Sequence, residues 1–161
     1  MKKYMSEHAR AAKMIRQELK KNGIKARVNA SSYAGGSSIR VVLSNEIPAV
    51  VDAVKSYVGD YQMGHFNGME DIYEYSNNNK SLPQVKFVFV ENSLSDDIRQ
   101  AAWDYVKANW GDMEAAPESY EDARQYNCKN GNGYDLIAKE LYPYGPDRGG
   151  FWMAYKMRIA A

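Results

Sequence analysis

Residues 25–43 read KARVNASSYAGGSSIRVVL, a pattern typical of a β-hairpin. Apolar and polar side chains alternate in residues 25–30 and again in residues 38–43, and a period of two predicts half-buried strands. At least one of Gly35 and Gly36 is expected to supply the positive φ that the connection between the strands requires. The alternation also predicts an outward face with three cations, Lys25, Arg27 and Arg40.

A helix is predicted on each side of this hairpin. Residues 6–22 repeat apolar side chains at helical spacing, and Gly23 ends the pattern. A second helix is expected after Asn45, with Pro48 in its first turn and Gly59 at its end. The chain is therefore expected to open α-β-β-α.

The remaining sequence predicts three more strands, at residues 72–76, 85–90 and 151–159. It also predicts a tight loop at residues 64–71 and further helices, at residues 95–109, from Ser119 and at residues 135–141. Residues 86–90 read KFVFV, which is apolar on both faces and predicts the central strand of a sheet.

These elements predict an α+β fold in which helices pack on a single, mostly antiparallel sheet of about five strands. The length of 161 residues fits one domain over residues 1–161, with the weakest join at residues 111–117. The expected core includes Val28, Ile39, Val41, Phe87, Phe89 and Tyr155.

Composition points to a cytoplasmic protein. Cys128 is the single cysteine, so no disulfide can form within the chain, and a reducing compartment fits best. The first ten residues lack the apolar segment of a secretory signal. No apolar run approaches the roughly 20 residues that a membrane span needs, so no membrane partner is expected.

The charges are distributed unevenly along the chain. Residues 1–43 carry ten Lys and Arg against two Glu, whereas residues 44–125 carry six Lys and Arg against fifteen Asp and Glu. A basic face predicts nucleic-acid binding as an alternative function, through Arg10, Lys13, Lys20, Lys25, Arg27 and Arg40. Residues 91–122 hold nine acids against two cations, which favours a further alternative, an acidic mimic of DNA that inhibits a DNA-binding enzyme.

No motif predicts catalysis, a metal or a cofactor. A structural zinc site needs four ligands, commonly in close pairs, and His8, His65 and Cys128 are scattered. The glycines at 35–36 and at 131–133 match neither phosphate-binding fingerprint. We therefore expect a protein that is not an enzyme.

Two segments resemble a known family. Residues 33–41 read YAGGSSIRV and residues 66–71 read FNGMED, and the apolar strand at residues 85–90 follows them. This pattern, after a basic helix, is similar to the twenty-ninth family of large polyvalent protein-associated domains. The resemblance implies a protein of phages or conjugative elements that helps an invading genome to establish itself, often against host defences. The family pattern has Asp where this chain has Asn67; if that position carries acid chemistry in the family, its loss argues against catalysis in this chain.

The sequence as a whole is interpreted as a non-enzymatic binding or accessory protein of such an element. Its expected partner is a bacterial host protein or nucleoprotein complex, with nucleic acid as the alternative; no oligomeric state is predicted. Exposed loops often carry function, and the two loops supply the predicted partner-binding residues Tyr33, Gly35, Gly36, Ser37, Arg40, Phe66, Asn67, Met69 and Asp71.

Overall fold

The computed structural model describes residues 4–77, 79–143 and 150–160, with side chains as far as residue 155. The chain forms two compact units, Met1–Ser93 and Leu94–Ala161, and each is described by itself. The stretch at 111–117, where the sequence suggested a sub-boundary, lies inside the second unit. The single domain over the whole chain stays a prediction.

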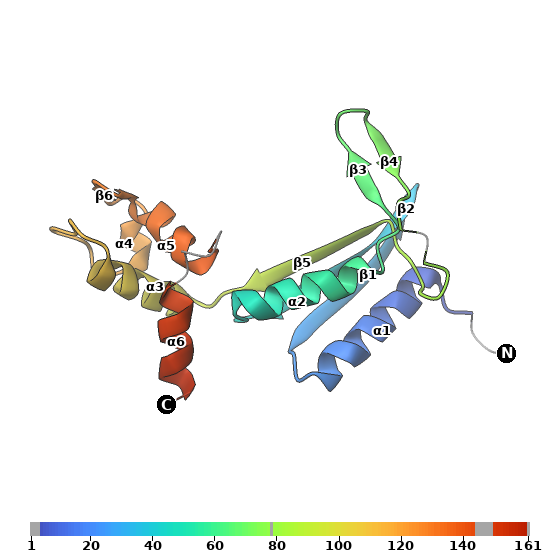
Figure 1. Cartoon of the computed structure of the whole chain (residues 1–161), viewed down its shortest axis with the longest axis horizontal. Coiled ribbons are helices and arrows are strands. Elements are labelled where there is room, and N and C mark those ends of the chain that lie inside the picture. The colour runs from blue at the N-terminus through green and yellow to red at the C-terminus, as the bar shows by residue number, and fades with distance from the viewer. Residues whose placement is uncertain (1–3, 78, 144–149, 161) are drawn as a thin grey trace. The chain divides into compact units, whose positions relative to one another are not determined.

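The first unit contains a three-stranded mixed sheet (Figure 1). Its elements are α1 (Glu7–Lys21), β1 (Ala26–Tyr33), β2 (Gly36–Ser44), α2 (Pro48–Gly59), β3 (His65–Asn67), β4 (Ile72–Glu74) and β5 (Phe87–Ser93). The central strand β2 pairs antiparallel with β1 and parallel with β5, and β3 and β4 form a separate hairpin. The predicted α-β-β-α opening and the α+β class are confirmed.

Both long helices of this unit cover the same face of the sheet (Figure 1). On that face β2 buries Ile39, Val41 and Leu43 completely. The helices contribute buried side chains of their own, Ala11, Ala12, Ile15, Leu19, Val54 and Val58. Each large side chain buried in this way stabilises the fold by about 1.5–3 kcal/mol relative to an exposed one. Among the described residues of the unit, no helix covers the opposite face.

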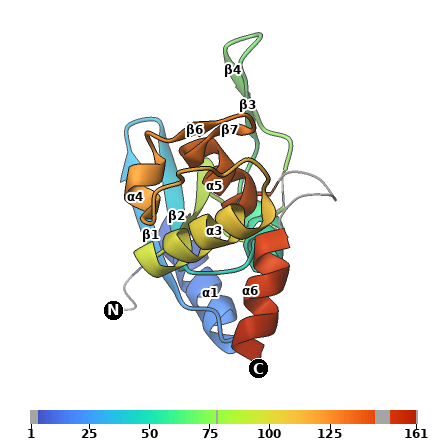
Figure 2. The ribbon, with the colours of Figure 1, turned by 90° about the vertical axis from the view of Figure 1, so that its left-hand side faces the viewer.

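The second unit is mainly helical (Figure 2). It contains α3 (Asp96–Asn109), α4 (Tyr120–Ala123), β6 (Asn127–Cys128), β7 (Gly131–Asn132), α5 (Gly133–Leu141) and α6 (Gly150–Ala160). The fully buried Trp103 of α3 donates its indole N–H to the carbonyl of Pro117 at 2.7 Å. Ser119 caps α4 by accepting the N–H of Asp122, as the sequence predicted.

The expected sheet is corrected in two respects. The seven strands of the described residues form one mixed three-stranded sheet and two small hairpins, rather than one sheet of about five strands. Residues 151–159, expected to be a strand, belong to helix α6. The buried carboxylate of Glu140 accepts the N–H of Phe151 in the first turn of that helix, and Trp152 donates its indole N–H to Leu141. These tertiary contacts outweigh the alternating apolar pattern.

The apolar strand β5 lies at an edge of the sheet, and not at its centre as predicted. Phe89 is 45% exposed, so its placement in the core was wrong. Val28, Ile39 and Val41 are buried as predicted. Phe87 and Tyr155 are half-buried. One further strand, β3, occupies part of the segment that was expected to be a loop.

A glycine substitution tests the β1–β2 turn. Gly35 has φ +86°, which the Cβ of an alanine opposes, although an added Cβ would meet no atom within 4 Å. We expect Gly35→Ala to lower the free energy of unfolding by about 1 kcal/mol, measured by urea denaturation. Gly59→Ala is the control, because its Cβ also meets nothing and its φ is not in the left-handed region. Equal stability of the two variants would contradict this account of the turn.

Candidate functional site

Four aromatic rings form a row on the uncovered face of the first unit; we call Tyr75, Tyr73, Phe87 and Phe89 the aromatic strip. Neighbouring ring centroids are 5.0 Å apart for Tyr75 and Tyr73, and 5.4 Å apart for Tyr73 and Phe87. The last pair, Phe87 and Phe89, is stacked at 6.2 Å with 19° between the ring planes. The strip joins the hairpin strand β4 to the sheet strand β5.

Alternation along the strands explains why these rings share one face. Successive side chains of a strand point to opposite faces. Val88 and Val90 pack on the core, so Phe87 and Phe89 point away from the helices. Phe66 is the cross-strand neighbour of Tyr73 and therefore lies on the same face of the hairpin. Contiguous exposed apolar surface is typical of interaction sites, which makes this face the candidate site.

Cations flank the aromatic strip. The Lys86 ammonium lies 5.1 Å from the ring centroid of Tyr73 and 5.8 Å from that of Phe87. The Arg40 guanidinium lies 5.6 Å from the Phe89 ring and forms an ion pair with Glu91. Arg27 is exposed on the same face of β1, and it lines a depression of about 620 Å³ together with Arg40 and Glu91.

Tyr73 connects the hairpin to the sheet. Its hydroxyl donates to the carbonyl of Lys86, and Lys86 donates through its ammonium to the carbonyl of Gly35. Burial raises the pKa of Tyr73 above its usual value, with a smaller contribution from Tyr75. Tyr73 is therefore neutral at physiological pH and adds no negative charge to this face.

The predicted partner-binding residues fall into two groups. Tyr33, Gly35 and Gly36 lie beside Lys86: a Cβ on Gly36 would be 3.0 Å from the Lys86 side chain and 3.1 Å from the Tyr33 ring. Arg40 and Phe66 share the aromatic face. Met69, Asp71, Ser37 and Asn67 lie elsewhere.

The second group belongs to the outer part of the hairpin and to the helix-covered face. Met69 is 98% exposed in the β3–β4 connection, and Asp71 has φ +53° just before β4. The side chain of Asn67 donates to Glu74 and accepts the N–H of Met69, on the face of the hairpin opposite Phe66. Ser37 lies two positions before the buried Ile39 on β2, so its side chain points to the same, helix-covered face.

The six cations of the nucleic-acid alternative do not share one surface. Arg10, Lys13 and Lys20 are exposed on α1, whose buried side packs on the covered face of the sheet. The outward residues of α1 therefore point away from Arg27 and Arg40. Sequence reasoning missed Tyr73, Tyr75 and Lys86 altogether. The contrast in size between Phe and Val in FVFV was a signal that the two sides of β5 differ.

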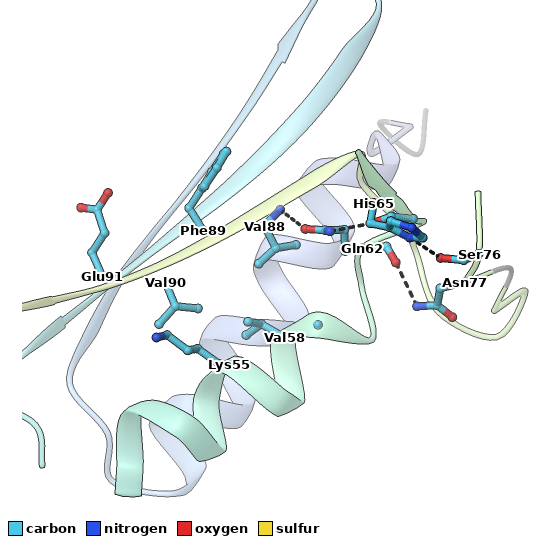
Figure 3. Close-up of a pocket in the computed structure, with 12 residues that line it drawn as sticks. Lys55, Val58, Gln62, His65, Ser76, Asn77, Val88, Phe89, Val90 and Glu91 are labelled. Atoms are coloured by element: carbon cyan, nitrogen blue, oxygen red, sulfur yellow. Dashed lines mark hydrogen bonds between the residues drawn. The ribbon is translucent and has the colours of Figure 1, made fainter. Parts of the chain in front are cut away.

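A second hollow, the edge groove, lies between α2 and the free edge of β5 (Figure 3). Its volume is about 580 Å³, and its lining includes Lys55 and Val58 of α2 and Val88 and Val90 of β5. Hydrogen bonds of Gln62 close one end of the groove (Figure 3). The side-chain oxygen of Gln62 accepts the N–H of Val88 at 2.8 Å, and the backbone carbonyl of Gln62 accepts from the side chain of Asn77 at 2.9 Å.

The second unit has a smaller cavity of about 320 Å³, and Arg99 and Arg124 are among the residues that line it. Arg124 lies 5.7 Å from the Tyr134 ring, so its charge is already in contact with an aromatic face. The acids of this unit also have local roles: Asp96 accepts from Tyr120, and Lys107 pairs with Asp104 and Glu118. Within the described residues, no three His, Cys, Asp or Glu side chains gather as a metal-binding group.

Fold and surface together define a small α+β domain with an exposed aromatic face. The chain belongs to the family Large polyvalent protein associated domain 29, whose model matches residues 6–109. The match covers the sheet, the β3–β4 hairpin and α3. No curated protein and no solved structure matches the chain. None of the helices in the described part of the chain has the length and apolar character that crossing a membrane requires.

Removing one hydroxyl tests the connection between the hairpin and the sheet. Tyr73→Phe deletes the hydrogen bond to the part-buried carbonyl of Lys86, and we expect the free energy of unfolding to fall by about 1 kcal/mol. Tyr75→Phe is the matched control, because Tyr75 is 68% exposed and should tolerate the loss. Thermal or urea unfolding measures both. A Tyr73→Phe variant as stable as wild type would show that this bond does not hold the hairpin.

Proposed function

We propose that this chain is a non-enzymatic accessory domain of a phage or conjugative-element protein, and that it binds single-stranded nucleic acid on the uncovered face of its first unit. The aromatic strip with its flanking cations is the observation that supports this proposal. The proposal places the protein in the bacterial cytoplasm and requires no metal or cofactor. Membership of the polyvalent-protein family supports the mobile-element setting.

The strip favours single strands because exposed rings stack on bases. Each base stacked on an aromatic side chain contributes about 1–3 kcal/mol, and every base offers such a face. In a duplex the base faces are stacked on each other and are not available to a flat sheet. Phe89 and Tyr75 are 45% and 68% exposed, so both rings are accessible to bases.

The charges of the first unit favour a polyanion. The unit holds thirteen Lys and Arg against nine Asp and Glu, a net charge of +4. The uncovered face carries four cations, Lys25, Arg27, Arg40 and Lys86, and one acid, Glu91. These cations would contact phosphates while the rings contact bases, as in other single-strand-binding surfaces.

A host protein or nucleoprotein complex is the second candidate partner. The outer part of the β3–β4 hairpin favours it, because Phe66 and Met69 are 54% and 98% exposed there. Aromatic residues and Met are enriched in protein–protein interfaces relative to the rest of the surface. The acidic-mimic alternative receives less support. Asp96, Asp97 and Asp122 lie in the first turns of helices, where acids stabilise the helix dipole.

Binding to a fluorescently labelled oligothymidylate of fifteen nucleotides tests the proposed function. We expect Phe89→Ala to weaken binding by about 5- to 150-fold, as the loss of one stacked base does. Arg27→Gln should weaken binding and lower the slope of log K against log salt by about 0.7. Arg10→Gln makes the same charge change on α1, and should leave affinity and slope unchanged. Fluorescence anisotropy at several salt concentrations measures all three variants.

Two results would contradict the proposal. One is absence of binding at low salt. The other is an equal effect of Arg27→Gln and Arg10→Gln, which would mean that the protein attracts the oligonucleotide by its net charge rather than by this face. A duplex of the same sequence serves as the competitor and should displace the single strand poorly.

A further inference from the structure

The free edge of β5 presents backbone groups that the sheet does not use. Along a parallel pair, alternate residues direct their N–H and C=O groups toward the neighbouring strand. Ser93 bonds toward β2, since its carbonyl accepts the N–H of Asn45 at 2.9 Å. Because Phe87, Phe89 and Glu91 lie an even number of positions from Ser93, their backbone groups also point toward β2. The backbone groups of Val88, Val90 and Asn92 therefore point away from the sheet, into the edge groove.

The chain itself already adds an extended segment to the start of this edge. Val85, just before β5, donates to the carbonyl of Tyr61 at 2.8 Å and accepts the N–H of Met63 at 2.9 Å. This is a parallel bridge between Gln62 and Val85. The Gln62 side chain then accepts the next outward N–H, that of Val88, in the place of a backbone carbonyl (Figure 3). Intramolecular pairing stops there because the chain turns away into β3.

Beyond Gln62, the edge lacks partners. In the described residues, no hydrogen bond involves the carbonyl of Val88, either backbone group of Val90, or the N–H of Asn92. An exposed edge of this kind is a template for another strand. The groups form a short, regular series of acceptor, donor, acceptor and donor, which matches an extended polypeptide.

The groove also has the side chains that such a strand needs. Val58 on α2 is almost fully buried and forms the apolar floor together with the half-buried Val88 and Val90. Lys55 is exposed on the helical wall, and no ion pair of the described residues involves it (Figure 3). A strand between β5 and α2 would direct every second side chain toward this floor.

We propose that the edge groove binds an extended segment of a partner protein by strand addition to β5. The segment places an apolar side chain against the half-buried Val88 and Val90 and an acidic side chain beside Lys55. Phe89 of the aromatic strip also lines the groove, but the two surfaces use different atoms. The added strand uses the backbone edge of β5 and the helix-covered side of the sheet, whereas the nucleic acid uses the exposed ring faces.

A displayed library of random seven-residue peptides, panned on the full chain, supplies the probe. The most enriched peptide is synthesised with two analogues, one N-methylated at its odd residues and one at its even residues. Only alternate N–H groups of an added strand face its neighbour. We expect one analogue to lose at least tenfold in affinity and the other to retain it. Lys55→Glu should also weaken binding at least tenfold, whereas Arg27→Gln should not.

Amide hydrogen exchange locates the bound peptide. In the free chain, the amides of Val90 and Asn92 should exchange fast, while those of Phe89 and Glu91 exchange slowly. Peptide binding should slow exchange at Val90 and Asn92 at least tenfold. This readout leaves the protein unmutated and therefore does not depend on whether a variant folds.

Four results would overturn the proposal. The first is that wild type enriches no peptide more strongly than the Lys55→Glu variant does, and the second is that both N-methylated analogues bind equally well. The third is that the peptide slows amide exchange at residues outside β5, and the fourth is that protection of the Val90 amide rises with protein concentration. The last would identify a second copy of this chain as the occupant. Addition of the oligothymidylate should not displace the peptide, so failure at one surface leaves the test of the other intact.

Discussion

Coverage of the sheet by helices on one face only is the constraint on which the rest of the structure depends. The connection from β2 to the parallel strand β5 runs through α2, which packs on the face that α1 already covers. With every described helix of the first unit on that side, the opposite face keeps its side chains exposed. Large rings on that face cover part of one another's surface: Tyr73 meets Phe87 edge to face, and Phe87 stacks on Phe89.

Local patterns predicted the elements whose neighbours in space are also neighbours in sequence. The β1–β2 hairpin, α1 and α2 follow from period-two and helical spacing with glycine at the turns. Pairings between distant residues were not predictable in this way. The parallel registration of β5 on β2 joins residues about fifty positions apart, and no local signal fixes it. Helix α6 was missed because its start depends on Glu140, a partner that alternation of apolar residues does not reveal.

The candidate site shows the same division. The cations of the hairpin's outer face were visible in the sequence, since strand alternation places Arg27 and Arg40 on one side. The aromatic strip was not, because the apolar run at residues 86–90 has two readings. An apolar residue on each side of a strand fits a central strand, and it equally fits an edge strand with one apolar side exposed. Only the position of β5 in the sheet separates these readings.

Strand β5 thus contributes to two surfaces, because its odd and even residues point their side chains and backbone groups in opposite directions. Its odd residues direct side chains to the uncovered face and backbone groups to β2, as Phe89 does. Its even residues direct side chains to the core and backbone groups to the groove, as Val90 does. Since a backbone partner at the edge and a base on the ring would use different atoms, occupation of one surface does not by itself block the other. An added strand would also protect the exposed edge, and would thereby stabilise the strand from which Phe87 and Phe89 project.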